Sequence, residues 1–304
     1  MRGVRAPGRA HLSAITLAAL VLGSVAALGL FHHLRTPELT PELRGYALAE
    51  GLGCHGCHGP RGTGGVRNPR AGFRQATGEI PAWDGGNAMM YVKSEDEIRE
   101  WILEGRPWRL VLRDSLEARA TRADSDTTSP FPEPGRVDVH PARLAAPTPP
   151  VRMPAYRNVI SDGQLEDLVA YYKAVAAFGD DMDAMPADAR RGYATARDTG
   201  CFGCHGPGGR LGAKNPRSFK GYVPPWHGPD FGELVRGDGE LRAWILDGSI
   251  PRIADNRVGR WFLSRQVVKM PAYRGVLADS SVDDVMSYIN WMARDERGDA
   301  TSSQ

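Results

Sequence analysis

The stretch Gly53-Cys54-His55-Gly56-Cys57-His58 decides the organisation of this chain, together with its second copy, Gly200-Cys201-Phe202-Gly203-Cys204-His205. Two cysteines separated by two residues and followed directly by histidine form the attachment signature of c-type haem. On one helical turn both thiols can reach the vinyl groups on one edge of a porphyrin, and the next residue places an imidazole over the iron. The residues expected to attach two haem c groups and to bind their irons are Cys54, Cys57 and His58 in the first motif and Cys201, Cys204 and His205 in the second.

A dithiol redox pair and half of a zinc site are the alternative interpretations of these motifs. A zinc site needs a second ligand pair near each motif, because two cysteines and one histidine leave the fourth position empty. A thioredoxin-like pair does not require the histidine that follows both motifs. All four cysteines of the chain lie in the two motifs, so none remains for a disulfide or a catalytic thiol.

The N-terminal segment is predicted to cross a membrane. Three arginines in the first nine residues precede an uncharged apolar run from Leu12 to Phe31, 20 residues long, which as a helix spans roughly 30 Å. Residues 1–34 hold three of the 38 basic residues and none of the 36 acidic ones, which favours an N-terminus inside and the remainder outside. A cleavable signal peptide ending near Ser24-Val25-Ala26 is the alternative.

In either case the chain is expected to be exported. We expect a single-pass protein of a bacterial cytoplasmic membrane with its haem domains on the periplasmic side, because covalent haem attachment in bacteria is completed outside that membrane. The near balance of charge after residue 34 gives no support for nucleic-acid binding.

The remainder of the chain is an internal duplication. Gly45-Tyr46-Ala47 returns as Gly192-Tyr193-Ala194, with the same shift as between Cys54 and Cys201. The segment pairs that also recur are Asn68-Pro69-Arg70 with Asn215-Pro216-Arg217, residues 99–105 with 242–248, and residues 153–157 with 270–274. A repeat of this length with one haem motif per copy predicts two tandem domains. The expected divisions are an anchor (1–36), a first domain (37–180), a second domain (181–297) and a polar tail (298–304).

Each copy is predicted to be helical. Thr40 before Pro41 is typical of a helix start, and Pro186 can open the equivalent helix in the second copy. The other expected helices are Glu95–Glu104 and Gly239–Asp247, closed by Gly105 and Gly248, and the longer amphipathic Ser161–Ala176 and Asp279–Arg294. The sequence contains no convincing alternating strand pattern, so the predicted fold class is all-α.

The first copy is longer than the second by 30 residues between its haem motif and the Met-Pro segment. The surplus lies at about 112–150, a proline-rich stretch of mixed charge that cannot bury a core of its own. We expect a long loop or wrapped arm that covers one edge of the first haem or touches a partner.

Met153 and Met270 are the candidates for the sixth position of each iron. They are the only methionines at matching places in the repeat, and each precedes Pro-Ala-Tyr, where proline keeps the backbone extended. The alternative is two core methionines. His140 and His227 are the competing sixth ligands, although neither has a counterpart in the other copy.

The order of these segments resembles class I cytochrome c, duplicated over residues 42–178 and 188–294. The whole is similar to membrane-anchored diheme cytochromes c, such as the diheme subunits of bacterial respiratory chains. The resemblance implies that a carbonyl of Pro60 or Pro207 accepts from the proximal imidazole. The other roles it implies are packing at a helix crossing for Tyr46 and Tyr193, a propionate contact or plain burial for Trp83 and Trp226, and haem contact for Tyr156 and Tyr273.

This resemblance implies electron transfer rather than catalysis. Histidine and methionine ligands would fill both axial positions, raise the potential relative to two histidines, and leave no open iron. The expected partners are redox proteins, among them a membrane respiratory or photosynthetic complex. The alternatives are a fixed subunit of a respiratory, photosynthetic or dehydrogenase complex, and a diheme enzyme of the peroxidase or thiosulfate-oxidising type. The enzymes need a displaceable ligand or a cysteine ligand, and the chain has no spare cysteine.

Overall fold

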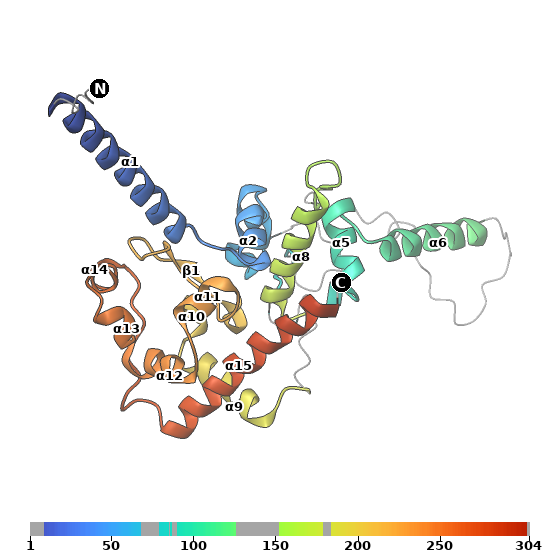
Figure 1. Ribbon diagram of the computed structural model, residues 1–304. Helices are drawn as coiled ribbons and strands as arrows, with labels where there is room; N and C mark the ends of the chain where they lie inside the picture. The colour runs from blue at the N-terminus through green and yellow to red at the C-terminus, as the bar shows by residue number, and fades with distance from the viewer. Residues whose placement is uncertain are drawn as a thin grey trace.

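The computed structural model describes residues 9–67, 79–84, 86, 90–125, 152–178 and 184–302 (Figure 1). These residues are mostly helical, and the only strands among them are β1 (Ala213–Lys214) and β2 (Tyr222–Val223), which pair antiparallel with Ala213 opposite Val223. The predicted all-α class is therefore confirmed at the level of secondary structure, with one short hairpin that the sequence did not predict.

The first helix, α1 (Arg9–Arg35), extends away from the rest of the molecule (Figure 1). Its segment Thr16–Arg35 is long and apolar enough to cross a membrane, and none of it is buried inside the molecule. Side chains such as Leu22 (70% exposed) and Leu28 (67% exposed) have no protein neighbours that would keep them from water. A helix that is apolar all round needs an apolar environment outside the chain.

Five elements recur in the same order in the described parts of the two copies. The elements of the first copy are α2 (Pro41–Gly51), α3 (His55–His58), the 3₁₀ turn η1 (Pro60–Gly62), α5 (Glu95–Glu104) and α8 (Asp162–Ala176). Those of the second copy are α9 (Ala187–Asp198), α10 (Phe202–His205), η2 (Pro207–Gly209), α12 (Asp238–Asp247) and α15 (Asp279–Ser302). Helix α2 packs against α8, and α9 packs against α15.

Both helix pairs cross at a glycine. A Cβ atom on Gly45 would lie 1.8 Å from the carbonyl oxygen of Asp167, and one on Gly192 would lie 1.9 Å from that of Asp284. Only glycine permits this close approach of two backbones. The preceding arginine of each pair, Arg44 or Arg191, makes a two-pronged ion pair with the same aspartate, with shortest distances of 2.7 Å. The triplet Arg-Gly-Tyr occurs in both copies, and each time it forms the same helix crossing.

The tyrosine after each glycine contributes to packing at the crossing, as expected. Tyr46 meets Tyr171 edge to face at 5.6 Å between ring centroids, and Tyr193 meets Tyr288 at 5.3 Å. Each copy has its own cluster of buried apolar side chains, built around Leu168 and Val169 on α8 in the first and around Val285 and Ile289 on α15 in the second.

Helix ends agree closely with their sequence signals. Gly105 and Gly248 adopt the left-handed conformation (φ 68° and 67°) directly after α5 and α12. Ser161 caps α8 and forms a capping box with Gln164. Thr40 stands at the N-cap position of α2, but its buried hydroxyl makes no capping bond.

Two predicted boundaries are wrong. Residues 108–125 form helix α6 (Trp108–Ser125), so the expected irregular arm does not begin at 112; the rest of that arm, with His140, lies outside the described residues. Helix α15 continues to Ser302 instead of ending at Arg294, so the predicted polar tail is largely helical. The second copy also contains three short helices, α11 (Pro229–Leu234), α13 (Pro251–Ala254) and α14 (Arg257–Arg265).

The segment between α1 and α2 lies against the second copy. The backbone amide of Glu38 donates to Asp230, and Arg35 donates to the carbonyl of Phe219. Leu211 of the second copy is buried in the hydrophobic cluster of the first. The second copy is therefore in contact both with the first copy and with the C-terminal end of α1.

Candidate functional site

Each Cys-x-x-Cys-His motif forms one turn of helix. Cys54 and Cys201 have helical backbone angles, and their carbonyls accept from the amides of His58 (3.0 Å) and His205 (3.1 Å). All four cysteine thiols are free and partly buried. Because the two cysteines of a motif are separated by three positions on a helical turn, their thiols lie on one side of that turn.

The histidine of each motif is held by one ring nitrogen. Nδ1 of His58 donates to the carbonyl of Pro81 (3.0 Å), and Nδ1 of His205 donates to that of Pro224 (2.9 Å). Burial lowers the pKa of both imidazoles, that of His205 to about 4. A neutral imidazole with Nδ1 bonded to a backbone carbonyl has Nε2 available as a metal donor, which is the usual arrangement of metal-binding histidines.

The expectation that Pro60 and Pro207 accept from these imidazoles is wrong. The carbonyl of Pro60 accepts from the backbone and hydroxyl of Thr63, and that of Pro207 accepts from the amide of Arg210 (3.1 Å). Both prolines begin the 3₁₀ turns that follow the motifs, and their carbonyls accept hydrogen bonds within these turns. The carbonyls of Pro81 and Pro224 accept from His58 and His205 instead.

A sequence signal for the real acceptors exists in the repeat. Pro81 and Pro224 each lie two residues before a tryptophan that occurs in both copies, Trp83 and Trp226. The chain returns to the motif at this point, since the amides of the two tryptophans donate to the carbonyls of Gly62 (2.7 Å) and Gly209 (2.8 Å).

The two tryptophans pack against the motif histidines. The ring centroids are 4.9 Å apart for Trp83 and His58 and 5.1 Å apart for Trp226 and His205. Trp226 is buried, with 4% of its surface exposed. The contact of Trp83 and Trp226 with a haem propionate stays a prediction.

The segments that contain Met153 and Met270 are fixed in the same way. The two amides that follow each Met-Pro-Ala unit, at positions 156 and 157 or 273 and 274, donate to carbonyls near the end of α5 or α12, at distances of 3.0 to 3.2 Å. A Cβ on Gly105 would lie 2.3 Å from the carbonyl oxygen of Met153, and one on Gly248 would lie 2.4 Å from that of Met270. Both methionines contact the hydrophobic cluster of their own copy.

Tyr156 and Tyr273 join the methionine segment to the cysteine motif. Their hydroxyls donate to Leu52 (3.4 Å) and Thr199 (3.0 Å), two residues before the first cysteine of each motif. Burial raises the pKa of both phenols, and the adjacent cysteine sulfur raises it further. The tyrosines therefore bring the thiol side and the methionine side of each copy together.

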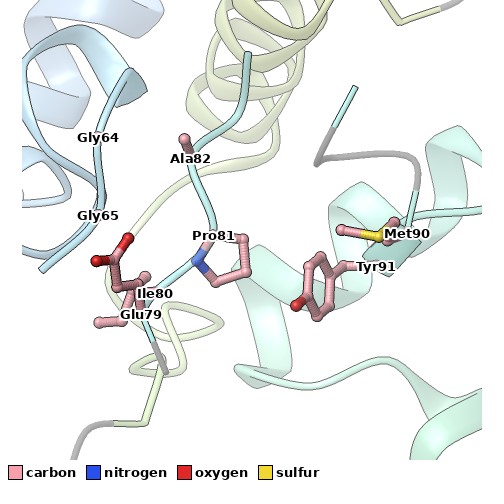
Figure 2. A pocket seen from close by; sticks show the side chains of 8 residues that line it. All are labelled: Gly64, Gly65, Glu79, Ile80, Pro81, Ala82, Met90 and Tyr91. Carbon is pink, nitrogen blue, oxygen red and sulfur yellow. The ribbon is translucent and has the colours of Figure 1, made fainter. Parts of the chain in front are cut away.

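A small pocket in the first copy lies beside the carbonyl acceptor of His58. Figure 2 shows Pro81, Tyr91 and Met90 around it, together with Glu79, Ile80, Ala82 and the backbone of Gly64 and Gly65. Met90, which lines this pocket, is a further methionine of the first copy. The indole nitrogen of Trp101 donates to the carbonyl of Tyr91, and that of the equivalent Trp244 donates to the carbonyl of Leu234. Tyr91 and Leu234 are therefore equivalent, and the residue before each, Met90 or Glu233, is equivalent too. Met90 thus lacks the duplication that singles out Met153.

His227, the competing candidate ligand of the second copy, is buried and makes other contacts. His227 is 4% exposed, and its Nε2 lies 3.3 Å from the carbonyl of Arg210 and 3.9 Å from the carboxylate of Glu42. In the described part of the chain, no group of three or more His, Cys, Asp or Glu side chains is arranged to hold a metal ion by itself. The donor set fits a haem better than zinc: two free thiols on one turn, a neutral imidazole oriented by a carbonyl, and a methionine on a fixed segment.

No family model, no curated protein and no solved structure matches the chain significantly. The functional conclusion therefore depends on the residues and on their repeated geometry.

Proposed function

We propose that the chain is a membrane-anchored diheme cytochrome c, made of two tandem class I cytochrome c-like domains (37–180 and 181–297), which transfers single electrons. The observation that carries this proposal is the duplicated Cys-x-x-Cys-His turn, whose histidine donates through Nδ1 to a proline carbonyl at 3.0 Å in one copy and 2.9 Å in the other. A dithiol redox pair has no use for a histidine oriented in this way.

In this function Cys54, Cys57, Cys201 and Cys204 would attach the two haems, His58 and His205 would be iron ligands through Nε2, and Met153 and Met270 would be the second protein ligands of the two irons. The haem groups supply the one-electron chemistry. The protein fixes the imidazole through the proline carbonyl and fixes the methionine backbone against the glycine that ends α5 or α12. Two protein ligands per iron leave no position for a substrate and raise the reduction potential relative to two histidines, so the chain is not proposed to be an enzyme.

Helix α1 anchors the protein in this proposal, in a bacterial cytoplasmic membrane with the haem domains on the periplasmic side. The partners are a membrane respiratory or photosynthetic complex and a second redox protein.

A fixed subunit of a larger complex is the second candidate function, and α6 favours it. Trp108, Leu112 and Leu116 occur every fourth residue on this helix and are 66%, 47% and 54% exposed. An apolar stripe of this spacing on a surface helix is typical of a contact with another chain.

The full chain, produced in a bacterium that attaches c-type haem and purified in detergent, tests the main proposal. Denaturing gels stained for haem and intact mass should show two covalent haems in the wild type and one in Cys54→Ala/Cys57→Ala or in Cys201→Ala/Cys204→Ala. Absence of covalent haem, or a stoichiometric zinc ion in its place, would refute the proposal.

Chains that copurify in stoichiometric amount from native membranes would favour the fixed-subunit candidate.

A further inference from the structure

Helix α14 is attached to the end of the anchor helix by an aromatic cluster. Phe262, the one buried residue of α14, meets Phe219 edge to face at 5.1 Å, and Phe219 meets Phe31 of α1 at 6.5 Å. The guanidinium of Arg35 lies over the rings of Phe31 (5.6 Å) and Phe262 (5.3 Å). These contacts place α14 beside the last turn of α1 (Figure 1).

The outer side of α14 is apolar and open. Val258 is 56% exposed and Trp261 is 52% exposed. Together with Phe31, Arg257 and Phe262 they line an open groove between α14 and the anchor helix. A soluble protein would not be expected to expose a tryptophan, a valine and a phenylalanine side by side without an occupant.

The same helix is strongly basic. It contains Arg257, Arg260 and Arg265 and no acidic residue, and all three arginines are exposed. Among the described residues no carboxylate forms an ion pair with any of them, and Arg265 instead lies over the Trp261 ring at 4.9 Å. Arg257 and Arg265 lie one helical turn before and one turn after Trp261, so these two arginines flank the tryptophan on the same side of the helix. A tryptophan flanked by arginines that lack carboxylate partners is typical of the boundary between lipid headgroups and hydrocarbon.

The groove lies at the end of the apolar span of α1, and this position favours lipid as its occupant. Phe31 belongs both to the groove and to the apolar span Thr16–Arg35, and it lies about 6 Å along the helix from Arg35 at ~1.5 Å per residue. If α1 crosses a bilayer, the groove therefore meets the headgroup layer directly. We propose that α14 docks on the membrane surface, with Trp261 and Val258 at the edge of the hydrocarbon and the three arginines against anionic lipid phosphates. This inference rests on the membrane anchoring that the proposed function includes.

Photocrosslinking of the full haem-loaded chain in lipid nanodiscs tests this proposal. Benzoylphenylalanine would replace Trp261, Trp108 or Leu22 in separate preparations, in discs of phosphatidylcholine with or without phosphatidylglycerol. Trp108 is the matched control, because it is also an exposed tryptophan (66%) but lies on α6 of the first copy. Leu22 lies within the span and reports insertion of α1.

We expect lipid adducts from positions 22 and 261 and at least severalfold fewer from position 108. In anionic discs, Arg257→Gln/Arg260→Gln should lower the yield at position 261 severalfold, and Arg236→Gln, on the same copy but outside α14, should leave it unchanged. Adducts from position 22 without adducts from position 261 would overturn the docking of α14 and leave the anchor intact. A crosslink from position 261 to a second copy or to another protein would also overturn it, and no lipid adduct at position 22 would refute the anchoring itself.

Discussion

At the residue scale, the glycine of each 3₁₀ turn makes room for the tryptophan that packs on the motif histidine. Gly62 and Gly209 both have φ of 78°, and a Cβ at either position would lie 2.2 Å from an indole carbon of Trp83 or Trp226. Left-handed backbone and direct contact both favour glycine here. The orientation of each imidazole thus depends on a residue that carries no chemistry of its own.

Gly62→Ala is therefore predicted to displace Trp83 from the His58 ring. We expect a loss of about 1–3 kcal/mol in the free energy of unfolding, the usual range for overpacking, and a shift in the potential of the first haem only. Redox titration and denaturant unfolding measure the two effects. Gly64→Ala is the control, because a Cβ at Gly64 meets nothing within 4 Å, and an equal effect of both variants would contradict the explanation.

At the scale of elements, the crossing of α2 with α8 depends on Gly45. We predict that Gly45→Ala destabilises the protein by about 3 kcal/mol, since its Cβ would lie inside the contact distance of the Asp167 carbonyl and the helices would have to separate. Denaturant unfolding followed by circular dichroism provides the measurement. Gly51→Ala, in the same helix but with open space around it, should be neutral or stabilise slightly, because alanine has the higher helix propensity. A comparable loss of stability in this variant would show that the effect of Gly45→Ala does not come from the crossing.

Helices with a capping residue at one end and a glycine at the other could be predicted from the sequence. Contacts between residues far apart in the sequence could not. Helix α5 has the predicted bounds Glu95–Glu104 because Ser94 caps it and Gly105 ends it. The resemblance to class I cytochrome c assigns the acceptor of His58 to Pro60, directly after the motif, whereas the observed acceptor, Pro81, is 23 residues away in the sequence. The sequence does not predict helix α6, because its mixed charge continues directly into a proline-rich stretch.

At the scale of the whole molecule, Asp230 joins the segment between α1 and α2 to the second copy. This carboxylate is 6% exposed and accepts from the amide of Glu38 (3.2 Å), the ammonium of Lys220 and the hydroxyl of Tyr222. Burial raises the pKa of Tyr222, and the bond to Asp230 raises it further. One buried carboxylate therefore holds three separate segments together.

Asp230→Asn should cost about 3–5 kcal/mol of the free energy of unfolding, because it leaves the Lys220 ammonium largely buried without its main partner. Hydrogen exchange at residues 36–40 should also become faster in the native protein. Glu233→Gln is the matched control: it removes the second, 62% exposed partner of the same lysine and should cost less than about 1 kcal/mol. Unchanged exchange at residues 36–40 in Asp230→Asn would show that this segment is held by other contacts.

The central claim is that each iron lies between a histidine and a methionine of its own copy, and axial-ligand spectroscopy of methionine variants tests it most directly. The wild type should show two six-coordinate low-spin haems with methionine–iron absorption at the red edge of the spectrum. Met153→Ala and Met270→Ala should each remove about half of that absorption and convert one haem to another spin state or ligand, while Met90→Ala should change nothing. If either Met153→Ala or Met270→Ala leaves the coordination of both irons unchanged, the proposed closed electron relay is contradicted.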